Sequence, residues 1–87
     1  MKPIRLSQHA LRYTRKRGFT VAEVEDTIRT SAWMPTELGP HDCRKNFSYG
    51  NEWNAELYAI KQVRPIFVEE PREIVVITVY TYYFNQP

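Results

Sequence analysis

The sequence predicts an α+β domain in which two N-terminal helices pack on an antiparallel β meander of three to four strands. Helix signals are confined to the first third of the chain, whereas the rest alternates strand-like runs with turn residues. Nearly every position from Ile74 to Phe84 is β-branched or aromatic, which is typical of a long strand. With 87 residues the chain has the size of one domain, so we expect residues 1–87 to form a single unit.

Capping residues mark the two helices. Ser7 is suited to an N-cap and Gly18 to the position just after a helix. Thr20 and Glu23 have the spacing of a capping box, and only a short connection joins the two helices, so they should pack as a pair. The predicted helices cover about 8–17 and 21–29.

Proline and glycine divide the rest of the chain. The turn residues 50–52 should join a first strand to a long second strand, which Pro65 should break or bulge because proline cannot donate to a ladder. Pro71 is suited to the turn before the last strand. The predicted strands cover about 44–49, 55–68 and 73–84; residues 1–6 are a lead-in that could pair with a sheet edge, and 30–43 an irregular loop.

The last strand is apolar on both faces at its start, with Val75, Ile77 and Val79 on one face and Ile74 and Val76 on the other. We therefore expect it to be central and covered on both sides over its first half. The even-numbered positions of the last strand continue as Thr78, Tyr80 and Tyr82. This row of hydroxyl groups would either line a groove or belong to the solvent-exposed half of an ordinary sheet.

Positive charge is concentrated at the N-terminus although the net charge is only +2. The first acidic residue is Glu23, and six cations precede it. Such a block suits a polyanion or an acidic partner protein, although a solvated helix face is an equally weighted interpretation. The six are Lys2, Arg5, Arg12, Arg15, Lys16 and Arg17.

Several classes of protein are disfavoured by what the sequence lacks. No apolar run approaches the roughly 18 residues of a membrane span, and the single cysteine, Cys43, fits a reducing cytoplasm, so we expect a cytoplasmic protein without membrane association. One cysteine and two histidines do not make a zinc site. No glycine-rich phosphate loop occurs, so we expect neither a metal nor a cofactor.

His9 is the candidate for chemistry. In the first turn of the predicted helix, the positive end of the helix dipole and nearby Arg5 and Arg12 disfavour an imidazolium. A neutral imidazole among guanidinium groups could take a proton from a ribose 2′-hydroxyl while the guanidinium groups hold the phosphate. A lone histidine on a helix surface is nevertheless more often structural.

Residues further along the chain could extend this surface. Lys45, Lys61 and Arg64 could bind phosphates, and Tyr80 and Tyr82 could stack a base or donate to a phosphate oxygen. The alternative for the tyrosines is that they fill the edge of the core.

The order of these residues resembles a bacterial family called domain of unknown function 4258, over roughly Leu6 to Tyr82. The resemblance rests on Ser7-x-His9-Ala10-Leu11, Arg15-x-Arg17-Gly18-Phe19-Thr20, a second helix rich in Val and Glu, and Ile77-Thr78-Val79-Tyr80. Within it, the family's histidine matches His9, its arginine before glycine matches Arg17, and its Thr-Val-Tyr matches Thr78 to Tyr80. The family is grouped with the RelE/ParE-type toxin superfold, which implies a curved antiparallel sheet.

The resemblance implies a toxin-like, metal-independent endoribonuclease of a toxin–antitoxin module, with RNA and a cognate antitoxin as partners. The alternative is a non-catalytic RelE/ParE-like protein-binding module or an adaptor. A free edge on the long last strand would also allow a homodimer. The predicted catalytic residues are His9, Arg12, Arg17 and Tyr80, and the predicted RNA-binding residues are Arg5, Lys16, Lys45, Lys61, Arg64, Thr78 and Tyr82.

Overall fold

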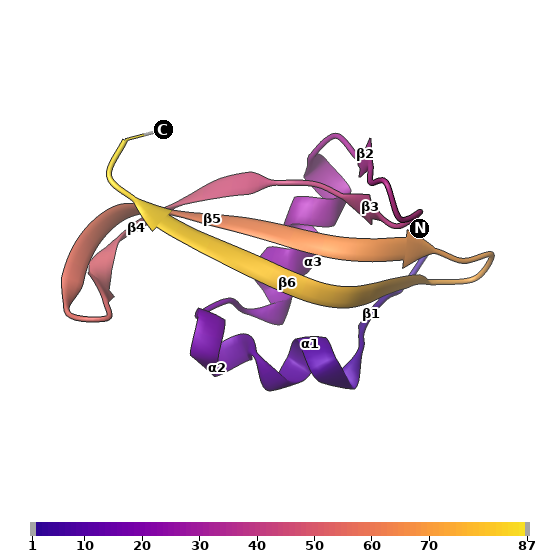
Figure 1. Cartoon of the computed structure of the whole chain (residues 1–87), viewed down its shortest axis with the longest axis horizontal. Coiled ribbons are helices and arrows are strands. Elements are labelled where there is room, and N and C mark those ends of the chain that lie inside the picture. Colours follow the sequence, from indigo (N-terminus) through magenta and orange to yellow (C-terminus); the bar gives the residue numbers. More distant parts are fainter. Residues whose placement is uncertain (1, 87) are drawn as a thin grey trace.

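The computed structural model describes residues 2–86, which form a layer of short helices on a mixed, mostly antiparallel sheet (Figure 1). The α+β class is confirmed, but within these residues the sheet has six strands rather than three to four. The strand order is β1-β6-β5-β3-β2, with β4 also paired to β5. The elements are β1 (Ile4–Leu6), α1 (Gln8–Arg12), α2 (Thr14–Arg17), α3 (Val21–Thr30), β2 (Met34–Pro35), β3 (His41–Asp42), β4 (Lys45–Trp53), β5 (Glu56–Glu69) and β6 (Ile74–Phe84).

The predicted lead-in contributes a parallel strand. Ile4 to Leu6 pair with Ile74 to Val76, so the sheet is mixed and not a pure antiparallel meander. The backbone N–H of Ser7 then donates to the carbonyl of Val76, and the Ser7 hydroxyl donates to the carbonyl of Ile77. Met1, which also belongs to the predicted lead-in, and Pro87 lie outside the described residues. These bonds fix the start of α1 against the first half of β6.

The first predicted helix is divided in two. Tyr13, with φ −97° and ψ 4°, separates α1 from α2, and its N–H bonds Ala10 three residues back instead of continuing the α-helical pattern. The predicted caps are confirmed, because Ser7 accepts from the Ala10 N–H and Gly18 ends α2 with φ 75°. The break turns the chain along the β6 side of the sheet (Figure 1).

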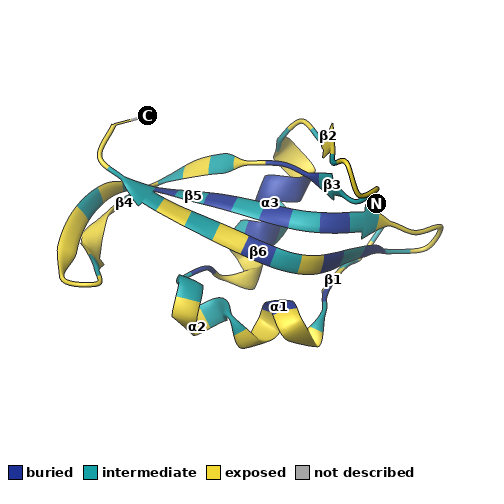
Figure 2. Cartoon of the chain, in the orientation of Figure 1, coloured by how far each residue is buried: buried dark blue, intermediate teal, exposed yellow. Residues whose placement is uncertain are grey.

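The second predicted helix forms as α3 with both bonds of the Thr20–Glu23 capping box. Val24, Thr27 and Ile28 are its buried residues; α3 packs against β5, and Val24 and Ile28 belong to the main hydrophobic core. Figure 2 shows this burial where α3 crosses behind the two long strands. No helix within residues 2–86 is long and apolar enough to cross a membrane.

Pro65 does not break β5, which runs unbroken from Glu56 to Glu69. Pro65 pairs with Val79 on one side and lies opposite the interval 43–44 on the other, where β3 has ended and β4 has not begun. The missing N–H of Pro65 therefore coincides with the gap between β3 and β4, and the predicted break lies between these two neighbouring strands instead of in β5.

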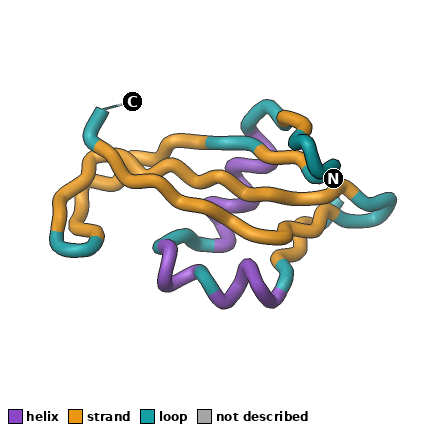
Figure 3. The backbone as a smooth tube through the Cα atoms, viewed as in Figure 1, coloured by secondary structure: helices purple, strands orange, loops and turns teal. Residues whose placement is uncertain are grey.

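The first hairpin turn lies later than predicted. Gly50, Asn51 and Glu52 belong to β4, and the register shift between Ser48 and Asn51 makes a bulge there, with Gly50 at φ 58°. The turn itself is Asn54 and Ala55, both with positive φ, as a two-residue hairpin turn of this kind requires. The β4–β5 hairpin projects from the rest of the sheet (Figure 3).

A bulge in β6 changes which side chains share a face. Ile66 pairs with Thr78 but Phe67 pairs with Val76, so Ile77 is an extra residue. Ile74, Val76 and Val79 are consequently buried under the helices, and the predicted grouping of Val79 with Val75 and Ile77 is wrong. Ile77 is 39% exposed, so the predicted cover on both sides is also wrong. Thr78, Tyr80 and Tyr82 share the open face.

Candidate nucleic-acid interface

Four of the predicted site residues form, together with Tyr13, a row of aromatic rings and guanidinium groups beside β6. The Arg17 guanidinium carbon lies 4.1 Å from the ring centroid of Tyr13 and 5.0 Å from that of Tyr80. Tyr80 in turn lies under Arg64, at 5.8 Å. At the other end, the Tyr13 ring is 4.9 Å from the ring of His9. We call His9, Tyr13, Arg17, Tyr80 and Arg64 the arginine–tyrosine row.

Arg17 is held in this row by hydrogen bonds. Its Nη1 donates to the hydroxyl of Thr78 at 3.1 Å and to the carbonyl of Val79 at 2.8 Å. The backbone carbonyl of Arg17 accepts from Tyr83 at 2.9 Å and from Thr81. Arg17 therefore links α2 to β6. Its guanidinium group is held in a fixed orientation, and it would interact with a ligand through its positive charge.

His9 and Arg12 are exposed on α1 and lie three residues apart, so they are neighbours on the helix surface. Within residues 2–86, the His9 ring makes a ring contact with Tyr13 and no hydrogen bond or ion pair. The Arg12 guanidinium makes no hydrogen bond or ion pair with another described residue. Both groups are thus accessible to a ligand.

A groove opens at the far end of the row, between the β2–β3 connection and the open face of the sheet. Its volume is about 490 Å³, within the usual range for small-ligand sites. Arg64, Thr78, Tyr80 and Tyr82 line it, four of the residues predicted from sequence. Its other lining residues are Thr36, Glu37, Leu38, Pro40 and Ile66.

Arg64 is oriented at the groove by its partners. Its Nε donates to Asp42 at 2.7 Å, and Nη1 reaches the Tyr82 hydroxyl at 3.4 Å. The hydrogen bonds to Tyr82 and to Asp42 raise the pKa of Arg64 above its ordinary value, so it stays charged. No acceptor among residues 2–86 uses its Nη2 group.

Two other predicted RNA-binding cations, Arg5 and Lys45, have partners outside the row. Arg5 forms two bonds of 3.0 Å with Glu73, and Lys45 binds Asp26 at 2.8 Å. Lys16 is exposed on α2, 5.6 Å from the Tyr13 ring centroid.

Lys61 lies inside the fold. It is only 6% exposed and donates to the Gly18 carbonyl and the Glu23 carboxylate. We leave Lys61 out of the site, because this arrangement closes the helix layer onto β5.

Two parts of the interface were missed from sequence. Tyr13 bridges His9 to Arg17, and its spacing of four residues from each, one helical turn, was the available signal. The wall of the groove made by residues 36–40 gave no signal, because it depends on how the β2–β3 hairpin folds back on the sheet. No group of three or more His, Cys, Asp or Glu side chains among residues 2–86 could hold a metal ion.

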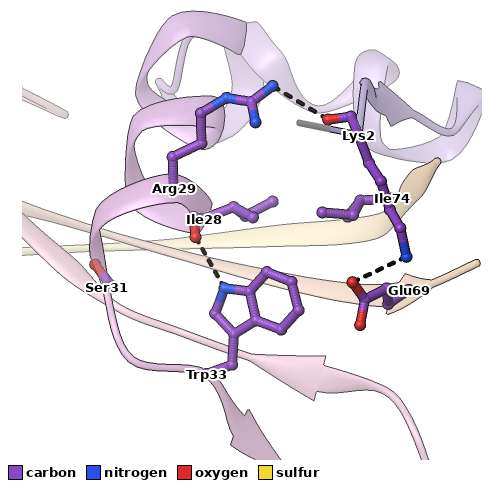
Figure 4. Close-up of a pocket in the computed structure, with 7 residues that line it drawn as sticks. All are labelled: Lys2, Ile28, Arg29, Ser31, Trp33, Glu69 and Ile74. Atoms are coloured by element: carbon purple, nitrogen blue, oxygen red, sulfur yellow. Dashed lines mark hydrogen bonds and ion pairs between the residues drawn. The ribbon is translucent and has the colours of Figure 1, made fainter. Parts of the chain in front are cut away.

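A second cavity, of about 340 Å³, lies between the end of α3 and the start of β6 (Figure 4). Its apolar part consists of Ile28, Trp33 and Ile74. Its polar groups mostly serve the fold, since Lys2 pairs with Glu69 at 3.1 Å and the Trp33 indole donates to the Ile28 carbonyl at 2.8 Å. It contains none of the residues predicted for chemistry, and we do not assign it to the interface.

Comparisons of this chain with protein-family models, curated proteins and solved structures find no match. The resemblance to domain of unknown function 4258 and to RelE/ParE-type toxins therefore stays a prediction from the sequence. The function must be argued from the interface itself.

Proposed function

We propose that this protein is a toxin-like endoribonuclease that binds single-stranded RNA along the arginine–tyrosine row and cleaves it without a metal. The observation that carries the proposal is the continuity of the row, which joins an accessible histidine to an aromatic groove through stacked guanidinium groups. Aromatic rings that stack bases, next to cations that bind phosphates, are the usual components of single-strand recognition.

The proposed chemistry places the scissile phosphate at α1. His9 accepts the proton of a ribose 2′-hydroxyl, whose oxygen attacks the adjacent phosphorus and forms a cyclic phosphate. The bond to the 5′-oxygen breaks, and that oxygen leaves with a proton from solvent or from a protonated side chain. Arg12, accessible beside His9, compensates the charge that develops on the phosphate oxygens. Arg17 and Tyr80 position the strand.

The test is cleavage of a labelled single-stranded RNA by purified wild type and His9→Ala in the presence of a chelator. We expect the variant to lose cleavage while keeping its circular dichroism spectrum, because the His9 side chain is exposed. Gln8→Ala, a change at the neighbouring exposed position, is the matched control and should cleave normally. A folded His9→Ala protein that cleaves like the wild type refutes the proposed role.

A non-catalytic protein-binding module is the second candidate, and the internal bonds of Arg17 favour it. The exposed surface of α1 and α2 would then bind an acidic segment such as a cognate antitoxin. That surface carries Arg12, Arg15 and Lys16 beside Leu11, which is 46% exposed.

Induced expression in bacteria separates the two candidates. Growth arrest with RNA loss in the wild type alone supports the nuclease. Arrest by both wild type and His9→Ala with intact RNA supports the binding module, and absence of arrest by either counts against a toxin.

A further inference from the structure

Among residues 2–86, Glu37 is the one acidic side chain that lines the groove, and the proposed chemistry does not use it. It lies on the β2–β3 connection, and no hydrogen bond or ion pair joins its carboxylate to another residue of 2–86. An acidic group in a site for RNA repels phosphate, so it needs a different explanation.

The connection that carries Glu37 is internally braced. The Thr36 hydroxyl and N–H donate to the Pro40 carbonyl at 2.7 and 3.0 Å, and the Gly39 N–H donates to the Thr36 carbonyl at 3.3 Å. Gly39 adopts φ 103°, which favours glycine in this tight turn. The turn therefore holds its tip residues, Glu37 among them, in a defined place at the groove wall.

The groove combines three kinds of contact. Tyr80 and Tyr82 supply aromatic surface on the sheet, Glu37 supplies two acceptor oxygens, and Arg64 supplies the Nη2 donors that no described residue uses. Asp42 accepts from Nε and Tyr82 from one N–H of Nη1, which leaves the second N–H of Nη1 and the Nη2 group for a planar acceptor pair.

Guanine is the base whose edges match this set. Its Watson–Crick edge has two adjacent donors, N1–H and N2–H, for one carboxylate, and its O6 and N7 are the acceptor pair that arginine recognises. Adenine and cytosine offer the carboxylate only one amino group, and uracil flanks its single N–H with two carbonyl oxygens that a carboxylate repels. The aromatic surface stacks any base and does not discriminate.

We infer that the groove is a guanine-specific subsite for single-stranded RNA, in which Glu37 accepts from N1–H and N2–H and Arg64 donates to O6 and N7. The inference rests on the proposed function, since it assigns the base that the same interface selects. It makes Glu37 a specificity-determining residue that takes no part in the proton transfer at His9.

Fluorescence anisotropy tests the subsite with labelled 2′-O-methyl octauridine carrying guanine, inosine, adenine, cytosine or uracil at one central position. The 2′-O-methyl groups remove the nucleophile, so binding is measured independently of cleavage. We expect the guanine oligomer to bind at least roughly tenfold tighter than the uracil oligomer, and inosine, which lacks the 2-amino group, to bind with intermediate affinity.

Glu37→Gln should reduce the preference for guanine to below about threefold without weakening binding of the uracil oligomer. Glu70→Gln is the matched control, since it makes the same charge change at an exposed position in the β5–β6 turn, and it should keep the wild-type preference. Equal binding of all five oligomers by the wild type overturns the guanine subsite but leaves RNA binding intact. A preference that survives Glu37→Gln overturns the role of Glu37, and failure to bind any oligomer overturns this inference together with the proposed function.

Discussion

Gly18 is the position where the structure most clearly forbids a side chain, so Gly18→Ala should be strongly destabilising. Its φ of 75° lies in the left-handed region, and an added Cβ would lie 2.5 Å from Cζ3 of Trp53 and closer still to the hydroxyl of Tyr83. Neither ring can move freely. Trp53 and Tyr83 stack at 4.6 Å, and the Tyr83 hydroxyl donates to the Arg17 carbonyl at 2.9 Å.

The expected loss has two parts. The left-handed backbone costs about 1 kcal/mol for alanine relative to glycine. Displacing packed aromatic rings costs a further 1–3 kcal/mol, roughly, because close-packed side chains relax only partly. The total of about 3 kcal/mol is a large part of the roughly 5–15 kcal/mol that stabilises a domain of this kind.

Urea unfolding followed by circular dichroism measures this loss, and Gly50→Ala is the matched control. Gly50 also has positive φ, 58°, but nothing lies within 4 Å of the Cβ that would be added there. The control should therefore lose only the backbone part, about 1 kcal/mol. Equal losses at the two glycines would refute the steric part of the reasoning, and no loss at either would refute both parts.

Three further predictions concern groups outside the proposed RNA contacts. Burial raises the pKa of Cys43 to about 11, so a thiol reagent at pH 8 should label it only as fast as the protein unfolds; rapid labelling of the native protein would contradict this. Lys61→Met removes the ion-pair partner of the Glu23 carboxylate, which then keeps, among residues 2–86, only the Thr20 N–H, and should cost about 3 kcal/mol in urea unfolding, whereas a loss below about 1 kcal/mol would make Lys61 a surface cation. The hydrogen bond from Arg5 lowers the pKa of Glu73. The pair therefore stabilises the protein above the unfolded pKa of Glu73, and this contribution is lost as the pH falls through the lower folded pKa. Glu73→Gln should flatten the acid side of a stability–pH curve, and an unchanged curve would contradict this prediction.

Local signals explain which elements were predictable. The capping box of α3 and the dense β-branched and aromatic run of β6 each determine their own element, and both formed close to the expected bounds. Pro65 was misjudged because its effect falls on the neighbouring strands, at the interval 43–44, which sequence order does not reveal. The position of Gly50 suggested a turn, but its positive φ serves a bulge.

Accessible residues of the candidate site could be predicted only where charge and helical spacing coincide with exposed positions. His9 and Arg12 are accessible as expected, since neighbouring positions on one helix face follow from helical geometry. Lys61 has the same charge as a phosphate-binding lysine, but the alternation of β5 points it toward α3 and Glu23. The groove wall at Glu37 depends on a hairpin folding back over the sheet, a long-range contact that no local pattern encodes.

Because Ile77 is an extra residue, the numbering of inward-facing and outward-facing side chains changes from even to odd between the two halves of β6. Upstream, even-numbered side chains such as Val76 belong to the interior, while downstream the odd-numbered ones do, beginning with Val79. If the strand alternated regularly through Ile77 without the bulge, Val79 would turn outward and Tyr80 and Tyr82 inward; deleting Ile77 would instead remove the bulge and leave these three side chains on their present faces. The chemistry of the open face therefore depends on the bulge as much as on composition, and a variant that lacks Ile77 should keep Tyr80 and Tyr82 on that face.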